Sequence, residues 1–214
     1  MYLAIEGVIG VGKTTLGRML HPIFDAELLL EEFDENPFLS KFYSNRNRYA
    51  FQTQICFLLS RYRQQRQSVL QAISRGNLIA DYTFEKDSLF AQLNLSGDEL
   101  ATYKLVHDAL AERIPVPDLI VYLQVRTEVA LKRIARRDRT FERDMDRDYI
   151  DSLNMAYEEH FGHYMGTRLL TIDSSAIDFV ANGKDLTSIE NRVRQALEIP
   201  PFQPQLPFQA SANA

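Results

Sequence analysis

The chain has 214 residues, with 24 Lys and Arg against 29 Asp and Glu, so its formal net charge is −5. A hydrophobic content of 45% and a charged content of 25% suit one globular α/β domain and exclude wholesale disorder. The single cysteine excludes a disulfide framework and a cysteine-rich zinc site, and the acidic balance argues against general duplex nucleic-acid binding.

The first elements expected along the chain are a short strand over residues 3–5, a glycine loop and a helix over residues 13–20. An apolar run over residues 28–30 predicts a second buried strand. Asn36-Pro37 predicts a turn and the start of a helix, with proline at its first position. Strand, loop and helix in this order are typical of an α/β unit.

Residues 47 to about 74 contain no glycine or proline, and their apolar residues recur at helical spacing, which predicts one long helix. A third strand is expected over residues 78–81. Residues 96–99 have capping-box spacing before a helix that should end near Pro115. The continuous apolar run over residues 119–125 predicts the strongest strand of the chain.

A basic helix to about Arg137 follows, then a helix over residues 149–165, a fifth strand over 169–172 and a last helix over 186–197. Strands that alternate with helices predict a five-stranded parallel sheet with helices on both faces. We expect one domain over residues 1–199 and a flexible tail over 200–214, where four prolines lie.

Charge is distributed unevenly along the chain. Residues 25–35 hold six acidic residues and no basic one, whereas residues 126–147 hold eight basic and five acidic residues, a local net charge of +3. No apolar stretch approaches the length of a membrane span, and the first residues lack a basic segment followed by a long apolar one. We therefore expect a cytoplasmic protein with no membrane or nucleic-acid partner.

Residues 7–14 read GVIGVGKT and fit the phosphate-binding pattern G-x-x-x-x-G-K-[ST]. Glycines let successive backbone N–H groups turn around a phosphate, and the helix N-terminus that follows favours its negative charge. Lys13 is expected to reach the outer phosphates, and the Thr14 hydroxyl is a candidate Mg²⁺ ligand. The expected nucleotide-binding residues of this segment are Gly7, Val8, Ile9, Gly10, Val11, Gly12, Lys13, Thr14 and Thr15.

The GTPase motifs DxxG and NKxD are missing after this loop, which favours a kinase of a small molecule. The segments EGVIGVGKTT, EEFDENPFLSKFY, FLLSRYRQ, LIADYTFEKDSLFA and RIARRDRTFER resemble the deoxynucleoside kinases, with consistent spacing to about Phe179. Within that family they are most similar to the bacterial purine deoxynucleoside kinases. The resemblance implies a P-loop kinase fold, usually a homodimer, that phosphorylates the 5′-hydroxyl of a deoxynucleoside with ATP and Mg²⁺.

The resemblance places Glu31 at the family's catalytic-base position. The residues themselves agree, because a doubly wound sheet binds its ligands beyond the carboxyl ends of its strands. A carboxylate there can accept a hydroxyl proton during phosphoryl transfer. Glu32 is the alternative base, although an extended backbone would point it elsewhere.

By the same resemblance, Tyr43 bonds the sugar 3′-hydroxyl, and Gln54 and Arg61 read the base from one face of the long helix. Gln52 is a competing glutamine that fits the spacing less well. Asp87 matches an aspartate that pairs with the base-reading arginine, with Lys86 as a rival at this position. Phenylalanines are expected to stack on or wall the base, and the candidates are Phe51, Phe84 and Phe90.

Asp81 matches the acidic residue that helps to hold Mg²⁺ in the family's D/E-R-S motif. Tyr82 stands where the motif usually has arginine, a departure that favours the deoxyguanosine kinase branch. It also leaves one fewer cation at the phosphates, so another residue must supply that charge. Tyr82 itself is an expected substrate contact.

The basic segment resembles the family's lid, expected over residues 133–146. The phosphate-clamping arginines it implies are Arg133, Arg137 and Arg139. Arginines on a closing lid stabilise the charge of the transferring phosphoryl group, and a closed lid excludes water. Glu142 matches a carboxylate that reaches the sugar 3′-hydroxyl. Residues 173–179 resemble the loop that holds the ATP adenine, with Asp178 and Phe179 as contacts.

The expected reaction is therefore transfer of the ATP γ-phosphoryl group to a purine deoxynucleoside, with deoxyguanosine favoured and deoxyadenosine next. A nucleoside monophosphate kinase such as thymidylate kinase is an alternative, although Tyr82 leaves it without an expected acceptor-phosphate arginine. A non-catalytic nucleotide-binding protein is a further alternative. His160 and His163 lie three residues apart but lack a third metal ligand.

Overall fold

Five parallel strands form one sheet in the order β2-β3-β1-β4-β5. The computed structural model describes residues 1–143 and 145–200, so the tail expected over 200–214 lies, except for Pro200, outside the described residues. The strands are β1 (Tyr2–Glu6), β2 (Ala26–Leu29), β3 (Asn77–Ala80), β4 (Leu119–Gln124) and β5 (Arg168–Asp173). The predicted parallel α/β architecture is confirmed.

Strand β1 is central because it pairs with β3 on one side and β4 on the other. Leu3 lies opposite Ile79 in β3 and Leu119 in β4. All five residues of β1 are buried, and β4 is buried as far as Leu123. A parallel sheet covered on both faces needs apolar side chains on both faces. This is why its strands stand out in the sequence as continuous apolar runs.

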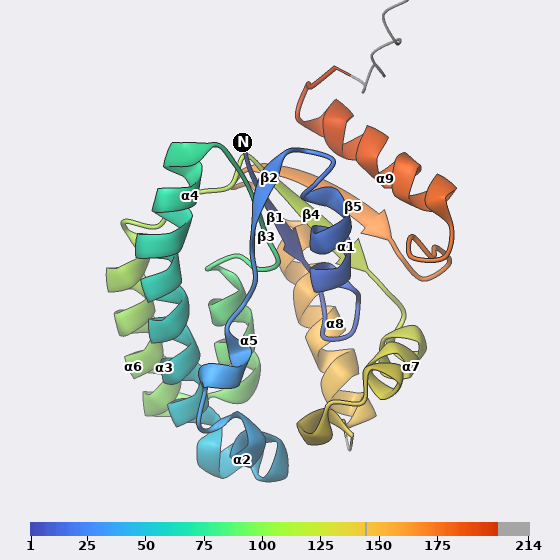
Figure 1. Ribbon diagram of the computed structural model, residues 1–214. Helices are drawn as coiled ribbons and strands as arrows, with labels where there is room; N and C mark the ends of the chain where they lie inside the picture. Colours follow the sequence, from blue (N-terminus) through green and yellow to red (C-terminus); the bar gives the residue numbers. More distant parts are fainter. Residues whose placement is uncertain (144, 201–214) are drawn as a thin grey trace, which may run out of the picture.

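Helices lie on both sides of the sheet, with α1 in front of it and α8 behind it in Figure 1. The helices are α1 (Lys13–Leu20), α2 (Leu39–Ser44), α3 (Arg46–Gln64), α4 (Leu70–Arg75), α5 (Lys86–Asn94), α6 (Gly97–Ala111), α7 (Thr127–Arg137), α8 (Arg147–Gly162) and α9 (Gly183–Ala196). No helix in the described part of the chain could cross a membrane.

Two 3₁₀ turns and one π-helical segment complete the described elements. They are η1 (Phe33–Glu35), η3 (Thr140–Glu142) and the π-helical η2 (Gln65–Val69). The single long helix expected from residue 47 to about 74 is therefore divided into α3, η2 and α4. In Figure 1, α2 and α7 lie beyond the carboxyl ends of the strands, α2 at the bottom of the view and α7 at its lower right.

The structure corrects two local predictions and adds one helix that the sequence does not predict. Pro37 is not the first helical residue, since α2 begins at Leu39; instead the Asn36 side-chain oxygen accepts a 3.0 Å hydrogen bond from Phe38 N, which forms a turn before the helix. Ser96 occupies the N-cap of α6 but makes no side-chain capping bond. Helix α5 was not expected, because its buried Lys86 and Asp87 interrupt the apolar pattern that predicts a helix.

Candidate active site

The phosphate loop connects β1 to α1, and its glycines are required where it packs on other elements. Gly10 has φ +82°, and a Cβ there would lie 2.6 Å from Ile134 Cγ1 and 2.8 Å from the Ala130 carbonyl oxygen. Gly12 has φ +111° and forms the N-cap of α1. The loop is therefore held against α7 in a shape that only glycine allows without strain.

Glu6 fixes the entry to this loop, and the sequence analysis did not single it out. Its carboxylate is fully buried and accepts hydrogen bonds from Gly7 N at 3.2 Å, Thr83 N at 2.6 Å and the Tyr157 hydroxyl at 3.1 Å. One side chain thus ties the phosphate loop to the segment after β3 and to α8. Only its position as the last residue of a buried strand could have indicated this role.

Lys13 lies at the mouth of the loop. Its ammonium donates to the Gly7 carbonyl at 2.7 Å and to the Val8 carbonyl at 3.1 Å. Burial lowers the pKa of Lys13 to about 8, and the charge of Lys86 acts in the same direction. The structure thus places this lysine where the motif predicts, beside the loop backbone. By contrast, Thr15 is exposed.

Thr14 and Asp81 meet at the carboxyl end of the sheet. The Thr14 hydroxyl donates to Asp81 Oδ2, and the backbone N–H of Glu31 donates to Asp81 Oδ1 at 2.8 Å. Asp81 directly follows β3 and is 5% exposed. The two candidate Mg²⁺ ligands are therefore adjacent, and the aspartate also positions the candidate base.

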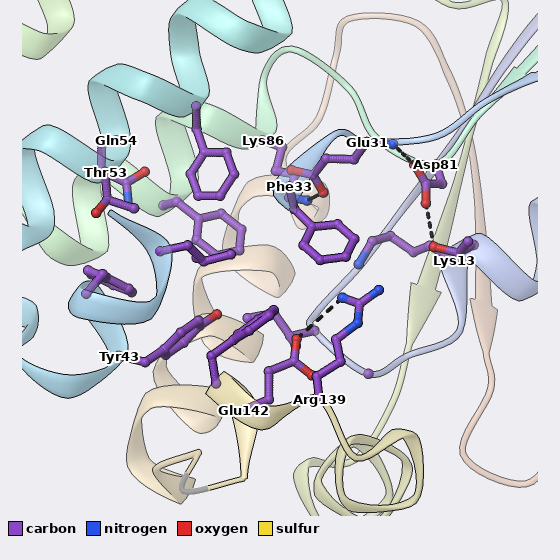
Figure 2. Close-up of a pocket in the computed structure, with 18 of the residues that line it drawn as sticks. Lys13, Glu31, Phe33, Tyr43, Thr53, Gln54, Asp81, Lys86, Arg139 and Glu142 are labelled. Atoms are coloured by element: carbon purple, nitrogen blue, oxygen red, sulfur yellow. Dashed lines mark hydrogen bonds and ion pairs between the residues drawn. The ribbon is translucent and has the colours of Figure 1, made fainter. Parts of the chain in front are cut away.

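One pocket of about 760 Å³, open mouth included, contains most of the predicted residues, and its size suits a small-molecule site. Figure 2 shows Gln54 at one end, Lys13 and Asp81 at the other, and Glu31 between them. The pocket is lined by Ile9, Gly10, Lys13, Thr14, Glu31, Phe33, Leu39, Phe42, Tyr43, Thr53, Gln54, Phe57, Arg61, Asp81, Lys86, Phe90, Arg137, Arg139, Phe141, Glu142 and Tyr149.

Glu31 is held by two cations. Arg61 donates to Glu31 Oε1 through Nη2 and, at 3.0 Å, through Nε, while Lys86 Nζ donates to Oε2 at 2.6 Å. Burial alone would raise the pKa of this carboxyl, but Arg61 and Lys86 outweigh burial and hold the pKa well below its usual range. The carboxylate is therefore charged and faces the pocket. Glu32, the alternative, is exposed and lines a different hollow.

Arg61 joins this carboxylate to a second one. Its Nη1 forms an ion pair with Asp87, whose side chain is fully buried, and the guanidinium lies 4.6 Å from the centre of the Phe57 ring. The structure thus brings together the predicted pair of Arg61 and Asp87. Lys86, the rival for that position, contacts Glu31 instead.

The far end of the pocket is apolar and contains one polar side chain without a partner. Gln54 is 2% exposed, and its Oε1 makes no hydrogen bond to the described residues. Phe57 and Phe90 line the pocket with it. Gln52 lies on the exposed side of α3, so the structure places Gln54 rather than Gln52 in the pocket.

The lid closes the opposite side through charged and aromatic contacts. Glu142 is 4% exposed and forms ion pairs with Arg137 and, at 3.6 Å, with Arg139. The Tyr43 ring stacks on Phe141 with a centroid distance of 5.9 Å. Tyr43, Glu142 and the two arginines therefore share one wall of the pocket, as Figure 2 shows for the three residues it labels.

Arg133 does not line this pocket, whereas Arg137 and Arg139, the other two expected clamping arginines, do. Its guanidinium donates to the carbonyl oxygens of Val11 at 2.9 Å, Ser174 at 2.8 Å and Ile177 at 3.4 Å, and to the Ser174 hydroxyl at 3.2 Å. Arg133 thus connects the phosphate loop to the loop after β5.

The candidate adenine contacts lie in that second loop and outside the pocket. Phe179 is buried, and its Cζ lies 3.2 Å from the position of a Cβ on Gly12. Asp178 Oδ1 accepts hydrogen bonds from the backbone N–H groups of Val180 and Ala181, at 3.1 and 3.0 Å. These bonds form a turn directly after Phe179, which lies against the phosphate loop.

Two further expected substrate contacts lie outside the pocket. Tyr82 is fully buried and donates to Gln64 Oε1 at 2.8 Å, and Phe84 is buried and stacks on His107 with a centroid distance of 5.1 Å. Neither side chain lines the pocket. Both side chains instead pack in the core, Tyr82 against Gln64 and Phe84 against His107.

Some pocket residues were missed by the sequence reasoning. On α3, Thr53 and Phe57 flank Gln54, and Phe57 precedes Arg61 by one helical turn, so helical spacing from the predicted pair could have indicated Phe57. Lys86 was weighed only as a rival to Asp87. The remaining omissions are aromatic or aliphatic residues, which the sequence does not separate from ordinary core residues: Phe33, Leu39, Phe42, Phe141 and Tyr149.

Comparison with known proteins gives consistent matches. A family model described as deoxynucleoside kinase matches residues 3–198. The chain is 34% identical to a deoxyguanosine kinase of Bacillus subtilis over 201 residues, which cover 92% of this chain and 97% of that protein. It is 39% identical to a deoxyadenosine kinase of Dictyostelium discoideum over 163 residues, which cover 74% of this chain and 65% of that protein.

Solved structures also match. A deoxyadenosine kinase from M. mycoides with bound dATP superposes with a TM-score of 0.80 at 26% identity, covering 91% of this chain and 99% of that one. The same protein with the products dCMP and dCDP superposes equally well. The predicted P-loop kinase fold is thereby confirmed.

Proposed function

The chain belongs to the deoxynucleoside kinase family, and from this premise we propose that it transfers the γ-phosphoryl group of ATP to the 5′-hydroxyl of a purine deoxynucleoside. Deoxyguanosine is the favoured acceptor and deoxyadenosine the next, in nucleotide salvage. The observation that carries the proposal is one pocket in which Glu31 lies between Lys13 of the phosphate loop and Gln54, whose buried Oε1 has no partner in the described residues.

Glu31 is proposed to receive the hydroxyl proton. Its carboxylate stays charged because Arg61 and Lys86 stabilise that form, so it can accept a hydrogen bond from the 5′-hydroxyl. As the bond between the 5′-oxygen and the γ-phosphorus forms, the hydroxyl proton passes to Glu31 and the electron pair of the broken bond leaves with ADP. A loose transition state requires little basicity before the bond has formed.

The residues Thr14 and Asp81 suit Mg²⁺, since a hydroxyl and a carboxylate oxygen are the hard donors that this ion prefers. We propose that these two side chains hold the ion, in part through water. Bound there with ATP, Mg²⁺ would neutralise charge on the β- and γ-phosphates. Within the described residues, no group of three His, Cys, Asp or Glu forms a metal site.

Three cations are proposed to stabilise the transferring phosphoryl group. Lys13 lies at the phosphate loop, and Arg137 and Arg139 reach the pocket from the lid segment, proposed to span residues 133–146. Positive charge that is already in place costs no reorganisation during the reaction. Arg133 is instead proposed to support the ATP site. Asp178 and Phe179 are proposed to contact the ATP base from the loop after β5, to which Arg133 is hydrogen-bonded.

Recognition of the acceptor rests on the other end of the pocket. Gln54 offers one donor and one acceptor to a purine edge, with Phe57 and Phe90 against the ring faces. Tyr43 and Glu142 are proposed to bind the sugar 3′-hydroxyl. The preference for deoxyguanosine is supported by the similarity to the Bacillus subtilis deoxyguanosine kinase.

We further propose a cytoplasmic homodimer built from one domain over residues 1–199. The adjacent helices α3 and α6 expose apolar side chains, with Leu59 50% and Leu105 75% exposed. Exposed leucines on neighbouring helices suit a symmetric helix–helix interface. Sedimentation analysis of the full chain and of Leu105→Glu tests the dimer, since a charge at the interface should yield a monomer.

The function is tested by measuring ADP release from ATP and Mg²⁺ with each of deoxyguanosine, deoxyadenosine, deoxycytidine, thymidine and dGMP. We expect turnover with the two purine deoxynucleosides, fastest with deoxyguanosine. Turnover with dGMP alone would instead identify a monophosphate kinase. A pyrimidine as the best acceptor would refute the purine preference but not the phosphoryl transfer.

A further inference from the structure

Lys86 occupies a position that is unusual for a lysine. Its side chain is 7% exposed, and it is the first residue of α5. Lysine is almost never fully buried unless it is paired, because its charge loses the stabilisation by water. Here the ammonium lines the pocket, donates to Glu31 Oε2 at 2.6 Å and lies 5.5 Å from the centre of the Phe90 ring.

The two cations on Glu31 differ in their freedom to move. Arg61 is fixed on two sides, because Nη1 pairs with Asp87 while Nε and Nη2 bond Glu31. A planar guanidinium cannot change one partner without disturbing the other. Lys86 is a point charge on a flexible stem with three donors, so it can reach a second anion without leaving its place.

The charge beside Glu31 changes during the proposed reaction. The acceptor arrives as a neutral hydroxyl and becomes a phosphate ester with two negative charges, while the Glu31 carboxylate gains the hydroxyl proton and loses its charge. Lys86 already lies beside that carboxylate and lines the same pocket as Lys13 of the phosphate loop. Figure 2 shows Lys86 next to Glu31, on the side of the pocket away from the lid residues Arg139 and Glu142. We infer that it is near both the anion that disappears and the place where the new anion forms.

We propose that Lys86 is a catalytic residue that pairs with Glu31 while the acceptor is a hydroxyl, and with the oxygens of the new 5′-phosphate once the phosphoryl group has arrived. The proposal rests on the proposed function and deepens it. It also identifies the cation that compensates for Tyr82, which stands where the family's usual motif has arginine and is buried away from the pocket.

The experiment compares Lys86→Met with the wild type in two binding measurements and one rate measurement. Methionine keeps an unbranched stem against Phe90 and removes the charge. Calorimetry gives the affinity of the full chain for deoxyguanosine or deoxyadenosine and for dGMP or dAMP, without ATP. A charge-assisted hydrogen bond to phosphate corresponds to roughly 10- to 100-fold in affinity. We expect K86M to lose that factor for the monophosphate, to bind the nucleoside within about threefold of wild type, and to lose at least about tenfold in kcat.

Lys184→Met, which removes an exposed lysine at the start of α9, is the matched control and should leave all three values unchanged. Unchanged monophosphate affinity in K86M would overturn the proposal, as would equal losses for nucleoside and monophosphate, because a merely structural lysine affects both. If K86M does not fold, as judged by circular dichroism, Lys86→Gln carries the same comparison with the same outcomes.

The activity of the wild type distinguishes a failure of this proposal from a failure of the proposed function. If it phosphorylates neither purine deoxynucleoside, the proposed function fails, whatever K86M shows. If the wild type is active and K86M retains its monophosphate affinity, the proposed function stands and the role of Lys86 fails. Lys86→Arg, which keeps the charge, should recover part of the monophosphate affinity, and no recovery would argue against a charge-based role.

Discussion

Replacing Glu31 with glutamine perturbs the acceptor end of the pocket with little change in volume. The amide oxygen can still accept the two hydrogen bonds that Arg61 donates to Oε1. The amide cannot take up the hydroxyl proton, and its NH₂ group would face the ammonium of Lys86, which now donates to Oε2. We expect Glu31→Gln to keep the shape of the pocket and to lose the proton acceptor.

The magnitude follows from how basic this carboxylate is. A positioned general base contributes typically about 10²–10⁴ in rate, which is about 3–5 kcal/mol of the barrier. Burial would raise the pKa of Glu31, but the stronger effect of Arg61 and Lys86 holds it well below its usual range. A weakly basic carboxylate accepts the proton late, so the lower end applies. We expect kcat to fall roughly 100-fold while KM for the deoxynucleoside stays within about threefold.

The assay is steady-state ADP release at saturating ATP with the deoxynucleoside varied. Glu32→Gln is the control, because Glu32 is the next residue in the chain but is exposed and lines a different hollow. The control should turn over as fast as the wild type. Near-normal turnover by Glu31→Gln would refute the reasoning, and a loss in Glu32→Gln with none in Glu31→Gln would assign the role to the neighbour.

Three other substitutions test the rest of the site. Gln54→Leu removes a buried amide whose Oε1 has no partner in the described residues, so KM for the purine deoxynucleoside should rise at least about tenfold while thermal stability is kept. An unchanged KM would exclude Gln54 from base recognition, and the control is Gln52→Leu at an exposed position. Arg133→Lys breaks some of the bonds to Val11, Ser174 and Ile177, so KM for ATP should rise about tenfold while KM for the nucleoside changes little. Arg136→Lys, at an exposed position, is the control and should leave KM for ATP unchanged. Equal changes in both KM values of Arg133→Lys would contradict this assignment. Gly10 has φ +82°, and Gly10→Ala places a Cβ 2.8 Å from a carbonyl oxygen, so the substitution should lower the melting temperature and the affinity for ATP. The control Gly162→Ala, which has open space around it, should lower neither. A Gly10→Ala protein as stable as the wild type would show that the loop can adjust.

The sequence predicts most of the sheet, the phosphate loop and the placement of Glu31, Gln54 and Arg61 in one pocket. These predictions succeed because their signals are local. A buried parallel strand must be apolar on both faces, a phosphate loop needs glycine at positive φ, and two residues seven positions apart on a helix share one face. The order of the chain then brings the carboxyl ends of β1, β2 and β3 to one edge.

The position of Arg133 could not be predicted from the spacing of the arginines in the motif. Arg133 and Arg137 are four residues apart, which suggests one shared face of a helix. However, the side chains of the two arginines differ in their contacts, since Arg133 bonds carbonyl oxygens of the phosphate loop and of the loop after β5, while Arg137 pairs with Glu142 in the pocket. Arg133 stays on the helix and packs against the phosphate loop. Which arginine reaches the pocket therefore depends on contacts between segments that are distant in the sequence.

The sequence predicts the surroundings of Lys86 and Tyr82 less well, for a related reason. A lysine in a sequence is usually exposed, and only the contact with Glu31, 55 positions away in the chain, makes a buried one stable. Tyr82 follows a strand that ends among polar residues, yet its hydroxyl finds a buried partner in Gln64. Long-range pairs of this kind are properties of the folded chain.

Arg61 is shared by Glu31 and Asp87, and this has a consequence for how the enzyme can be changed. A substitution at Asp87 chosen to admit a different base would release one side of the guanidinium and alter the charge balance at Glu31. We therefore expect a substitution at Asp87 to change acceptor choice and turnover together. A redesign of specificity has to restore the charge that it removes, and a double-mutant cycle between Asp87 and Glu31 would measure the linkage.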